Sequence, residues 1–361
     1  MLIVDAHEDI AYSALVGGRD FRMSVADKRK NDPGDSARGR EGQATVGLPD
    51  LLEGSVAVVF GTLYASPARS QFGGDNASGY ATPQQAEAQA RAQLDYYRRV
   101  ADEDPRLTLI STGRDLEAHL MRWSSSGTAA PLDKLGVGLV PLMEGADPIV
   151  KPDDVKRWFD DGVRIVGLSW GQTRYAGGTR APGPLSDDGK KLLKLMSEIG
   201  MVWDVSHLAE ESFWQGMDIF QGRVIASHSN CREYVPTDRH LTDDMIRALV
   251  ERDAVIGCVL YNRFLRADWT PEKGKHAVTL KDDVLRHIDR VCQIAGNARH
   301  AGIGSDFDGG FGAASTPAEL DSVADFGKLA PALKDAGYKP EDVEAIMGGN
   351  WLRVVKETLP R

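Results

Sequence analysis

The chain has 361 residues, of which 42% are apolar and 27% are charged, and its 43 basic and 53 acidic residues give a formal net charge of −10. This length suits one large α/β barrel or two medium domains, and the apolar fraction is too high for a disordered chain. The acidic balance argues against a general nucleic-acid-binding protein, which needs a positive field to hold phosphates. The three cysteines at 231, 258 and 292 are too few for a disulfide scaffold and match no zinc-ribbon spacing.

The two ends of the sequence predict no attachment to a membrane. The first ten residues carry three acids and no apolar segment of signal-peptide length. The longest apolar-rich run, at 55–65, is too short to span a bilayer, and the last residues include no hydrophobic tail. We therefore expect a cytoplasmic protein whose thiols are free and buried in its core.

Short β-rich runs alternate with longer amphipathic segments along the chain. Several runs are continuous in valine, isoleucine and leucine, which is typical of parallel strands covered on both faces. The predicted strands are 2–7, 55–63, 137–143, 164–169, 201–206, 224–228, 254–260 and 301–305. The predicted helices, several of which have a serine, proline or acidic start and a glycine stop, are 83–104, 151–162, 186–200, 241–252, 279–296 and 340–359.

Eight strands with intervening helices predict an α/β fold of the (β/α)8 TIM-barrel type, with a doubly wound open sheet as the alternative. Because no repeat and no linker divides the chain, we expect residues 1–361 to form a single domain. Two polar, irregular stretches, at 19–48 and 66–82, follow the first and second strands. In a barrel these stretches would be long loops at the end where the strands finish, which is the end that carries active sites.

Six side chains that can bind a metal lie where predicted strands end. They are His7 and Asp9 after the first strand, Glu144 after the third, His207 after the fifth, His228 after the sixth and Asp306 after the eighth. A parallel barrel would gather these strand ends in one ring. Three imidazoles and three carboxylates suit one or two divalent ions, of which zinc is the best match, and burying them without an ion would be costly. The sequence therefore predicts a metal site.

Other motifs support weaker interpretations. His119 and His287 do not lie at predicted strand ends and are assigned to helices, where a hydrogen-bonded core histidine is expected. Asp306 and Asp308 in SDFDGG lack the further oxygen donors of a calcium loop. GIGSDFDGGFG lacks the G-x-G-x-x-G order of a nucleotide-binding protein. A metal-binding barrel without catalysis is a further alternative to an enzyme.

The sequence resembles the membrane (renal) dipeptidase family, metallopeptidases of the amidohydrolase superfamily. The resemblance is carried by DAHEDI, MEGAD, DVSH, ASHS, GIGSDFDGG and GGNWLRVV, which follow the family's order from about residue 2 to 356. It implies two Zn²⁺ per chain, a small-molecule substrate and an assembly compatible with a homodimer. By this resemblance His7 and Asp9 would hold one ion, His207 and His228 the second, and Glu144 would bridge the two.

The resemblance also implies roles in substrate binding and catalysis. Asp306 would accept a proton from the bridging water, Arg239 would grip the substrate carboxylate, and Tyr261 would line the substrate. This predicts a dipeptidase that uses a metal-bridging hydroxide.

The chain departs from the family pattern after the fourth predicted strand. Where the family typically shows L-T-H, this sequence reads Leu168-Ser169-Trp170, and an indole N–H donates one hydrogen bond without carrying charge. Either Trp170 lines the pocket and changes the substrate, or another donor replaces the histidine; the candidates are Arg174, Tyr175 and His240. The alternative function is therefore a related amidohydrolase that acts on N-acyl amino acids, cyclic amides or lactams. Smaller departures are Glu8 for the usual asparagine and Ala146-Asp147 for the frequent Gly-His.

Overall fold

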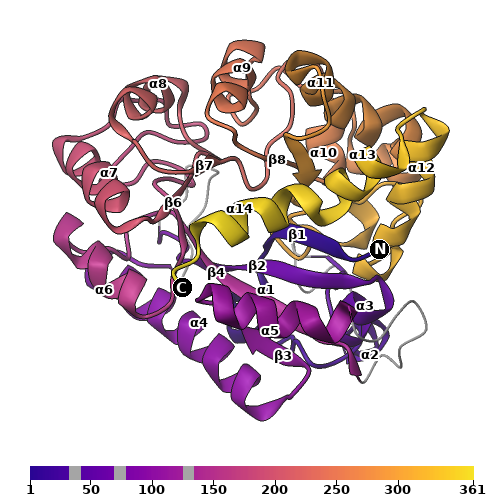
Figure 1. The fold of residues 1–361 in the computed structure, drawn as a ribbon, viewed down its shortest axis with the longest axis horizontal. Coiled ribbons are helices and arrows are strands. Elements are labelled where there is room, and N and C mark those ends of the chain that lie inside the picture. The colour runs from indigo at the N-terminus through magenta and orange to yellow at the C-terminus, as the bar shows by residue number, and fades with distance from the viewer. Residues whose placement is uncertain (32–41, 69–78, 125–133) are drawn as a thin grey trace.

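A computed structural model describes residues 1–31, 42–68, 79–124 and 134–361 of the chain. Its strands form one parallel sheet (Figure 1). They are β1 Ile3–Glu8, β2 Val56–Tyr64, β3 Leu107–Leu109, β4 Val137–Glu144, β5 Ile165–Gly167, β6 Val202–Asp204, β7 Val224–Ile225, β8 Ile256–Cys258 and β9 Ala301–Ile303.

Eight of these strands follow one another around a barrel in the order β7-β6-β5-β4-β2-β1-β9-β8. The two ends of this series, β7 and β8, meet through a bridge between Ala226 and Ile256. There the Ala226 N–H donates to the Val255 carbonyl at 3.0 Å, and the Gly257 N–H donates to the Ala226 carbonyl at 2.8 Å. The predicted (β/α)8 barrel is therefore confirmed. Strand β3 was not predicted, and it pairs with β4 outside the barrel path.

The helices surround the barrel (Figure 1). Their bounds are α1 Ile10–Leu15, α2 Val25–Asn31, α3 Leu48–Glu53, α4 Pro83–Glu103, α5 Gly113–Ser124, α6 Val155–Asp160, α7 Asp187–Ile199, α8 Glu210–Ile219, α9 Asp243–Glu251, α10 Asn262–Leu265, α11 Leu285–Ala295, α12 Leu329–Asp335, α13 Pro340–Glu344 and α14 Asn350–Thr358. A π-helical turn precedes α11 at Leu280–Val284, and another precedes α14 at Ala345–Gly349. The predicted helices at 279–296 and 340–359 therefore each contain such a turn.

The two stretches predicted as irregular loops are only partly described. Helix α2 lies inside 19–48, and α3 begins at the end of that stretch, so an unbroken loop was the wrong expectation there. In the stretch 66–82, Pro67 pairs with Tyr80 through a parallel bridge. Residues 32–41 and 69–78 of the two predicted loops lie outside the described residues.

Helix α14 packs across one end of the barrel. Its Trp351, Val354 and Val355 join a buried cluster with residues near the beginnings of strands, such as Val4 and Val202. The indole N–H of Trp351 donates to the Ile303 carbonyl at 2.9 Å, and its ring lies 5.4 Å from that of Phe60. This cluster fills the end at which the strands begin. The polar side chains of the predicted site lie at the opposite end, where the strands finish. In the described part of the chain, no helix is long and apolar enough to cross a membrane.

Two buried histidines on outer helices serve packing, as the sequence predicts. His119 on α5 has Nε2 2.8 Å from the Ala57 carbonyl and Nδ1 3.3 Å from the Thr108 hydroxyl. His287 on α11 has Nε2 3.1 Å from the Leu265 carbonyl, and its Nδ1 accepts the Cys231 N–H at 3.1 Å. A carbonyl can only accept, so each ring is a neutral Nε2–H tautomer. Burial lowers the pKa of both His119 and His287 to about 4.

We predict that these histidines make the protein less stable in mild acid. Between pH 6.5 and about 4 the unfolded chain binds protons that the folded chain excludes, so stability falls as the pH falls through this range, by up to about 3 kcal/mol per histidine. Urea unfolding at pH 7.5 and 5 should therefore show a smaller loss of stability for His119→Gln than for the wild type. The matched control is His276→Gln, because His276 is exposed. An equal loss for all three proteins would contradict the prediction.

Candidate metal centre

The six predicted metal-site residues meet at the end of the barrel where the strands finish. His7 lies within β1, Asp9 follows β1, and Glu144 is the last residue of β4. His207, His228 and Asp306 each lie three residues beyond the ends of β6, β7 and β9, because these strands end earlier than predicted. None of the six residues exposes more than 8% of its surface. The parallel sheet therefore brings residues from both ends of the chain into one buried site.

Glu144 stands at the centre of this group. Its Oε1 lies 3.2 Å from Nε2 of His207 and 3.4 Å from Nε2 of His228. Its Oε2 lies 3.6 Å from Nε2 of His7, and that nitrogen is 3.9 Å from Oδ1 of Asp306. Two sets of potential ligand atoms, from His7, Asp9 and Asp306 and from Glu144, His207 and His228, each lie within 4.8 Å of one another. The arrangement places groups of potential metal ligands on either side of one carboxylate.

The other ring nitrogen of each histidine faces a hydroxyl. Nδ1 of His7 and Nδ1 of His228 lie 3.3 Å and 2.8 Å from Oγ of Ser227. Nδ1 of His207 lies 3.0 Å from Oγ1 of Thr179. This leaves all three Nε2 atoms directed toward Glu144, in the manner of metal-binding histidines whose second nitrogen is held by a hydrogen bond.

Two observations test whether these residues fit metal ions. Nε2 of His7 is buried and has no hydrogen-bond partner among the described residues. Nε2 of His207 and Nε2 of His228 lie 3.0 Å apart, so two unprotonated nitrogens there would repel each other unless a cation or a proton lay nearby. Imidazole nitrogens and carboxylate oxygens are common ligands of zinc. The donor set therefore fits divalent ions.

The electrostatics of the protein alone are unfavourable at this site. Burial and the charge of Glu144 raise the pKa of Asp9 to about 7. Burial also raises the pKa of Asp306 well above its usual range. Burial alone would lower the pKa of His7, but the Glu144 carboxylate and two further acids raise it to about 9. Burial lowers the pKa of His207 to about 4. The carboxylates lie close together and are buried away from water, and both effects make their charged forms unfavourable. Bound cations would offset this cost.

Two of the predicted residues adopt strained backbone conformations. His207 has a φ of 65° and Asp306 a φ of 62°, in the left-handed region that few residues other than glycine occupy. Such strain persists where the surrounding structure fixes it, and it is frequent at functional sites.

The sequence analysis did not identify the residues that hydrogen-bond to the predicted metal ligands. Asp204, at the end of β6, forms a third set of potential ligand atoms with His7 and His228. The signal was present, because Asp204 opens the DVSH motif and Ser227 precedes the histidine of ASHS. Thr179 lies in the segment after β5 and carried no motif. A pattern along the chain does not show that these hydroxyls and this carboxylate face the imidazoles.

Arg239 and Tyr261 lie beside the cluster and contact the same ring. The Arg239 guanidinium, from a side chain only 4% exposed, donates to the His228 carbonyl at 2.7 Å and contacts Oγ of Ser229 at 3.3 Å. Its central carbon lies 5.4 Å from the ring of Phe264, which is 5.0 Å from the ring of Tyr261. Tyr261 also stacks on Phe311 at 4.4 Å. The structure brings Arg239 to the carbonyl of His228, one of the predicted metal ligands, whereas Tyr261 lies one ring farther away.

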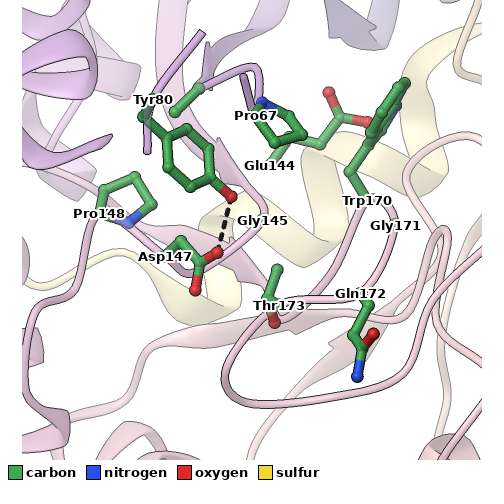
Figure 2. Close-up of a pocket in the computed structure, with 11 residues that line it drawn as sticks. Pro67, Tyr80, Glu144, Gly145, Asp147, Pro148, Trp170, Gly171, Gln172 and Thr173 are labelled. Carbon is green, nitrogen blue, oxygen red and sulfur yellow. Dashed lines mark hydrogen bonds between the residues drawn. The ribbon is translucent and has the colours of Figure 1, made fainter. Parts of the chain in front are cut away.

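Trp170 forms one wall of a pocket next to Glu144 (Figure 2). Its indole ring lies 6.1 Å from the ring of His207 and 5.3 Å from that of Tyr64. On the other side of the pocket the Tyr80 hydroxyl donates to Asp147 at 2.6 Å. Trp170 therefore lies where a substrate bound at the Glu144 cluster would meet it.

The three candidates for a replacement of the family histidine differ in their surroundings. Arg174 binds Asp147 and the carbonyls of Ile149 and Val150, and the Tyr175 hydroxyl also donates to the Ile149 carbonyl. Both side chains therefore hold the segment after β4. His240 is buried against Phe264, and no described residue accepts from or donates to its ring.

A parallel barrel with imidazoles and carboxylates buried where its strands finish has the architecture of a metal-dependent hydrolase. The comparison with known families is specific. The chain belongs to the membrane dipeptidase family (peptidase family M19), whose model matches residues 1–359. It is therefore an enzyme of a metallopeptidase family, as the sequence predicts.

Individual relatives agree with this assignment. Dipeptidase aclJ of Aspergillus oryzae is 27% identical over 316 residues, which cover 86% of this chain and 69% of that protein. An uncharacterized protein in the pqqA 5′ region of Klebsiella pneumoniae is 33% identical over 212 residues, covering 56% of this chain and 75% of that protein. A Rhodobacter sphaeroides metallopeptidase, liganded with a phosphinate mimic of the dipeptide L-Ala-D-Ala, has the same fold, with a TM-score of 0.78 and 23% identity over 99% of both chains.

Another solved structure, the metallopeptidase described as dipeptidase AC, has a TM-score of 0.79 at 22% identity and covers 100% of this chain and 99% of that one. Both solved structures span the barrel from end to end, so the fold seen here is that of the family.

We predict that removing divalent ions destabilises the protein. Ions that bind only the folded chain stabilise it by about 3 kcal/mol at a hundredfold excess over their dissociation constant. Dialysis against a chelator should therefore lower the urea midpoint of unfolding, and added Zn²⁺ should restore it. Identical unfolding curves before and after metal removal, with the metal loss verified by elemental analysis, would contradict this expectation.

Proposed function

We propose that this protein is a zinc-dependent dipeptidase with two ions per chain. The observation that carries the proposal is the convergence of three Nε2 atoms on one buried carboxylate, Glu144, while the three Nδ1 atoms face hydroxyls. His7 and Asp9 would hold one ion with Glu144, and His207 and His228 would hold the second with the same carboxylate. When bound, the ions supply Lewis acidity toward a carbonyl oxygen and toward a water molecule.

Asp306 is the residue that we assign to proton transfer. Its carboxylate reaches the same space as Nε2 of His7, at 3.9 Å, and a backbone hydrogen bond of 3.1 Å from its own N–H to the His7 carbonyl fixes it beside β1. In this proposal Asp306 accepts a proton from the attacking water and donates it to the leaving amine. Positioned acid–base groups of this kind contribute about 10²- to 10⁴-fold to a rate.

Arg239 supports a substrate with a free carboxylate. Its guanidinium is buried beside the cluster and is fixed by the His228 carbonyl. A guanidinium binds a carboxylate through two parallel hydrogen bonds, so it favours dipeptides over amides that lack a terminal carboxylate. Tyr261 and Trp170 would line the substrate. The proposal treats residues 1–361 as one catalytic domain, and the homodimer and the cytoplasmic location stay predictions from the sequence.

The test is a metal analysis paired with a panel of L-L and L-D dipeptides and their C-terminal amides. We expect about two zinc ions per chain and hydrolysis of dipeptides in preference to their amides. Asp306→Asn should keep the metal and lose about 10²- to 10⁴-fold in kcat. A zinc-loaded wild type that cleaves no dipeptide would defeat the proposal, and full activity in Asp306→Asn would remove Asp306 from the proton path.

Trp170 favours a second candidate, an amidohydrolase for N-acyl amino acids, cyclic amides or lactams. Its indole, and not a histidine, stands beside His207 and the pocket. An indole cannot stabilise negative charge as an imidazolium can, and loss of one oxyanion donor elsewhere costs about 10²- to 10³-fold.

We predict that Trp170→His shifts activity toward dipeptides if the protein is a dipeptidase. The same panel, extended with N-acyl amino acids and lactams, measures the ratio of kcat/KM values for wild type and variant. Trp170→Phe is the matched control, since it keeps an aromatic wall and adds no donor. A wild type that cleaves only the added substrates, and that loses this activity in Trp170→His, would establish the second candidate.

A further inference from the structure

One serine hydroxyl contacts two of the proposed metal-binding histidines. Oγ of Ser227 lies 3.3 Å from Nδ1 of His7 and 2.8 Å from Nδ1 of His228. By the assignment above these histidines belong to different ions. The rings of His7 and His228 stack with centroids 3.5 Å apart, and neither side chain is exposed. Ser227 therefore lies behind both cation positions at once.

The Ser227 hydroxyl donates its proton in a hydrogen bond to the carboxylate of Asp204. Asp204 accepts the Ser227 hydroxyl at Oδ2, and its Oδ1 accepts the N–H groups of Ser206 at 3.0 Å and Ser227 at 2.9 Å. A hydroxyl has one proton to donate and two lone pairs that accept. Because Ser227 donates to Asp204, both imidazoles must donate their Nδ1–H to Ser227. In a neutral imidazole that donates Nδ1–H, Nε2 carries the lone pair, and this is the tautomer that binds a metal from the Glu144 side.

We propose that Ser227, oriented by Asp204, is a positioning residue shared by both metal positions. It fixes the tautomer and the ring orientation of His7 and His228 together, so the two positions are formed or lost together. Thr179 fixes the tautomer and ring orientation of His207 alone, through its 3.0 Å contact with Nδ1. This inference rests on the proposed function, because it takes these three histidines as metal ligands.

The experiment is a zinc titration of the metal-free protein against a chromophoric chelator, with wild type, Ser227→Ala, Asp204→Asn and Thr179→Val. Loss of a group that orients a ligand costs about 10- to 100-fold in metal affinity. We expect Ser227→Ala to weaken both binding steps by this factor and Thr179→Val to weaken one. Ser229→Ala is the matched control, because the buried Ser229 hydroxyl contacts Arg239 and Ser206 instead of an imidazole.

Asp204→Asn separates positioning from simple packing. The amide keeps the volume of the carboxylate and can still accept both N–H groups at its oxygen, but its nitrogen donates to Ser227. The Ser227 proton must then turn to one imidazole, which becomes an Nε2–H tautomer and loses its lone pair toward the metal. Histidine side-chain nitrogen NMR of the metal-free protein, recorded above the raised pKa of His7, should show this change of tautomer, and the titration should show at least one weakened step.

Three outcomes would overturn the inference. They are wild-type zinc affinities in both Ser227→Ala and Asp204→Asn, loss of only one binding step in Ser227→Ala, and unchanged tautomers in Asp204→Asn. Folding of each variant is checked by circular dichroism, and the NMR arm stands on Asp204→Asn if Ser227→Ala does not fold. A wild type that binds no divalent ion would instead refute the proposed function, so the two failures are distinguishable.

Discussion

The burial of Glu144 among three imidazoles and two further carboxylates is the constraint on which this structure depends. Desolvating a charged group is expensive unless opposite charge and hydrogen bonds compensate it. Here the compensation from the protein is incomplete, because burial raises the pKa of both Asp9 and Asp306, which lie beside the third carboxylate, Glu144. A bound cation would supply the missing charge and would lower the free-energy cost of burying these groups together.

Two equivalent Asp–Ser hydrogen-bond pairs fix the backbone around this site. Asp204 on β6 binds the N–H and the hydroxyl of Ser227, and Asp5 on β1 binds the N–H and the hydroxyl of Ser305. Ser227 immediately precedes His228, and Ser305 immediately precedes Asp306. In each case a carboxylate on one strand fixes the chain where a neighbouring strand ends. The functional side chain that follows is thus aimed by a buried hydrogen-bond pair.

The same framework explains two glycines. A Cβ at Gly257 or Gly304 would lie within 2 Å of the Ser227 carbonyl oxygen. Strands β8 and β9 can therefore approach the Ser227 segment closely only if these positions lack a side chain. The close approach closes the barrel next to the predicted metal site, where the pairing of β7 with β8 is reduced to a single bridge.

The sequence predicted the barrel and the six converging residues because both depend on order along the chain. Continuous apolar runs mark parallel strands, and a polar residue at each run's end must lie at one face of the barrel. Strand β3 was not predicted, since three residues give no periodicity, and α2 was hidden in a stretch rich in charge and glycine. Ser227 and Thr179 were missed for another reason. Their roles depend on which ring nitrogen they face, and that is a property of the folded arrangement.

The position of Trp170 connects substrate recognition to the metal site. The Trp170 carbonyl accepts the Thr179 N–H at 3.1 Å, and the Thr179 hydroxyl faces Nδ1 of His207. The segment that places the indole in the pocket therefore also orients a proposed ligand. A substitution at Trp170 that moves this backbone would alter His207 as well as the pocket wall. A change in specificity here is free of a change in metal binding only if the Trp170–Thr179 hydrogen bond is kept. The segment after β5 thus both places the Trp170 indole in the pocket and orients His207 through Thr179. Substitutions in this segment must preserve both roles.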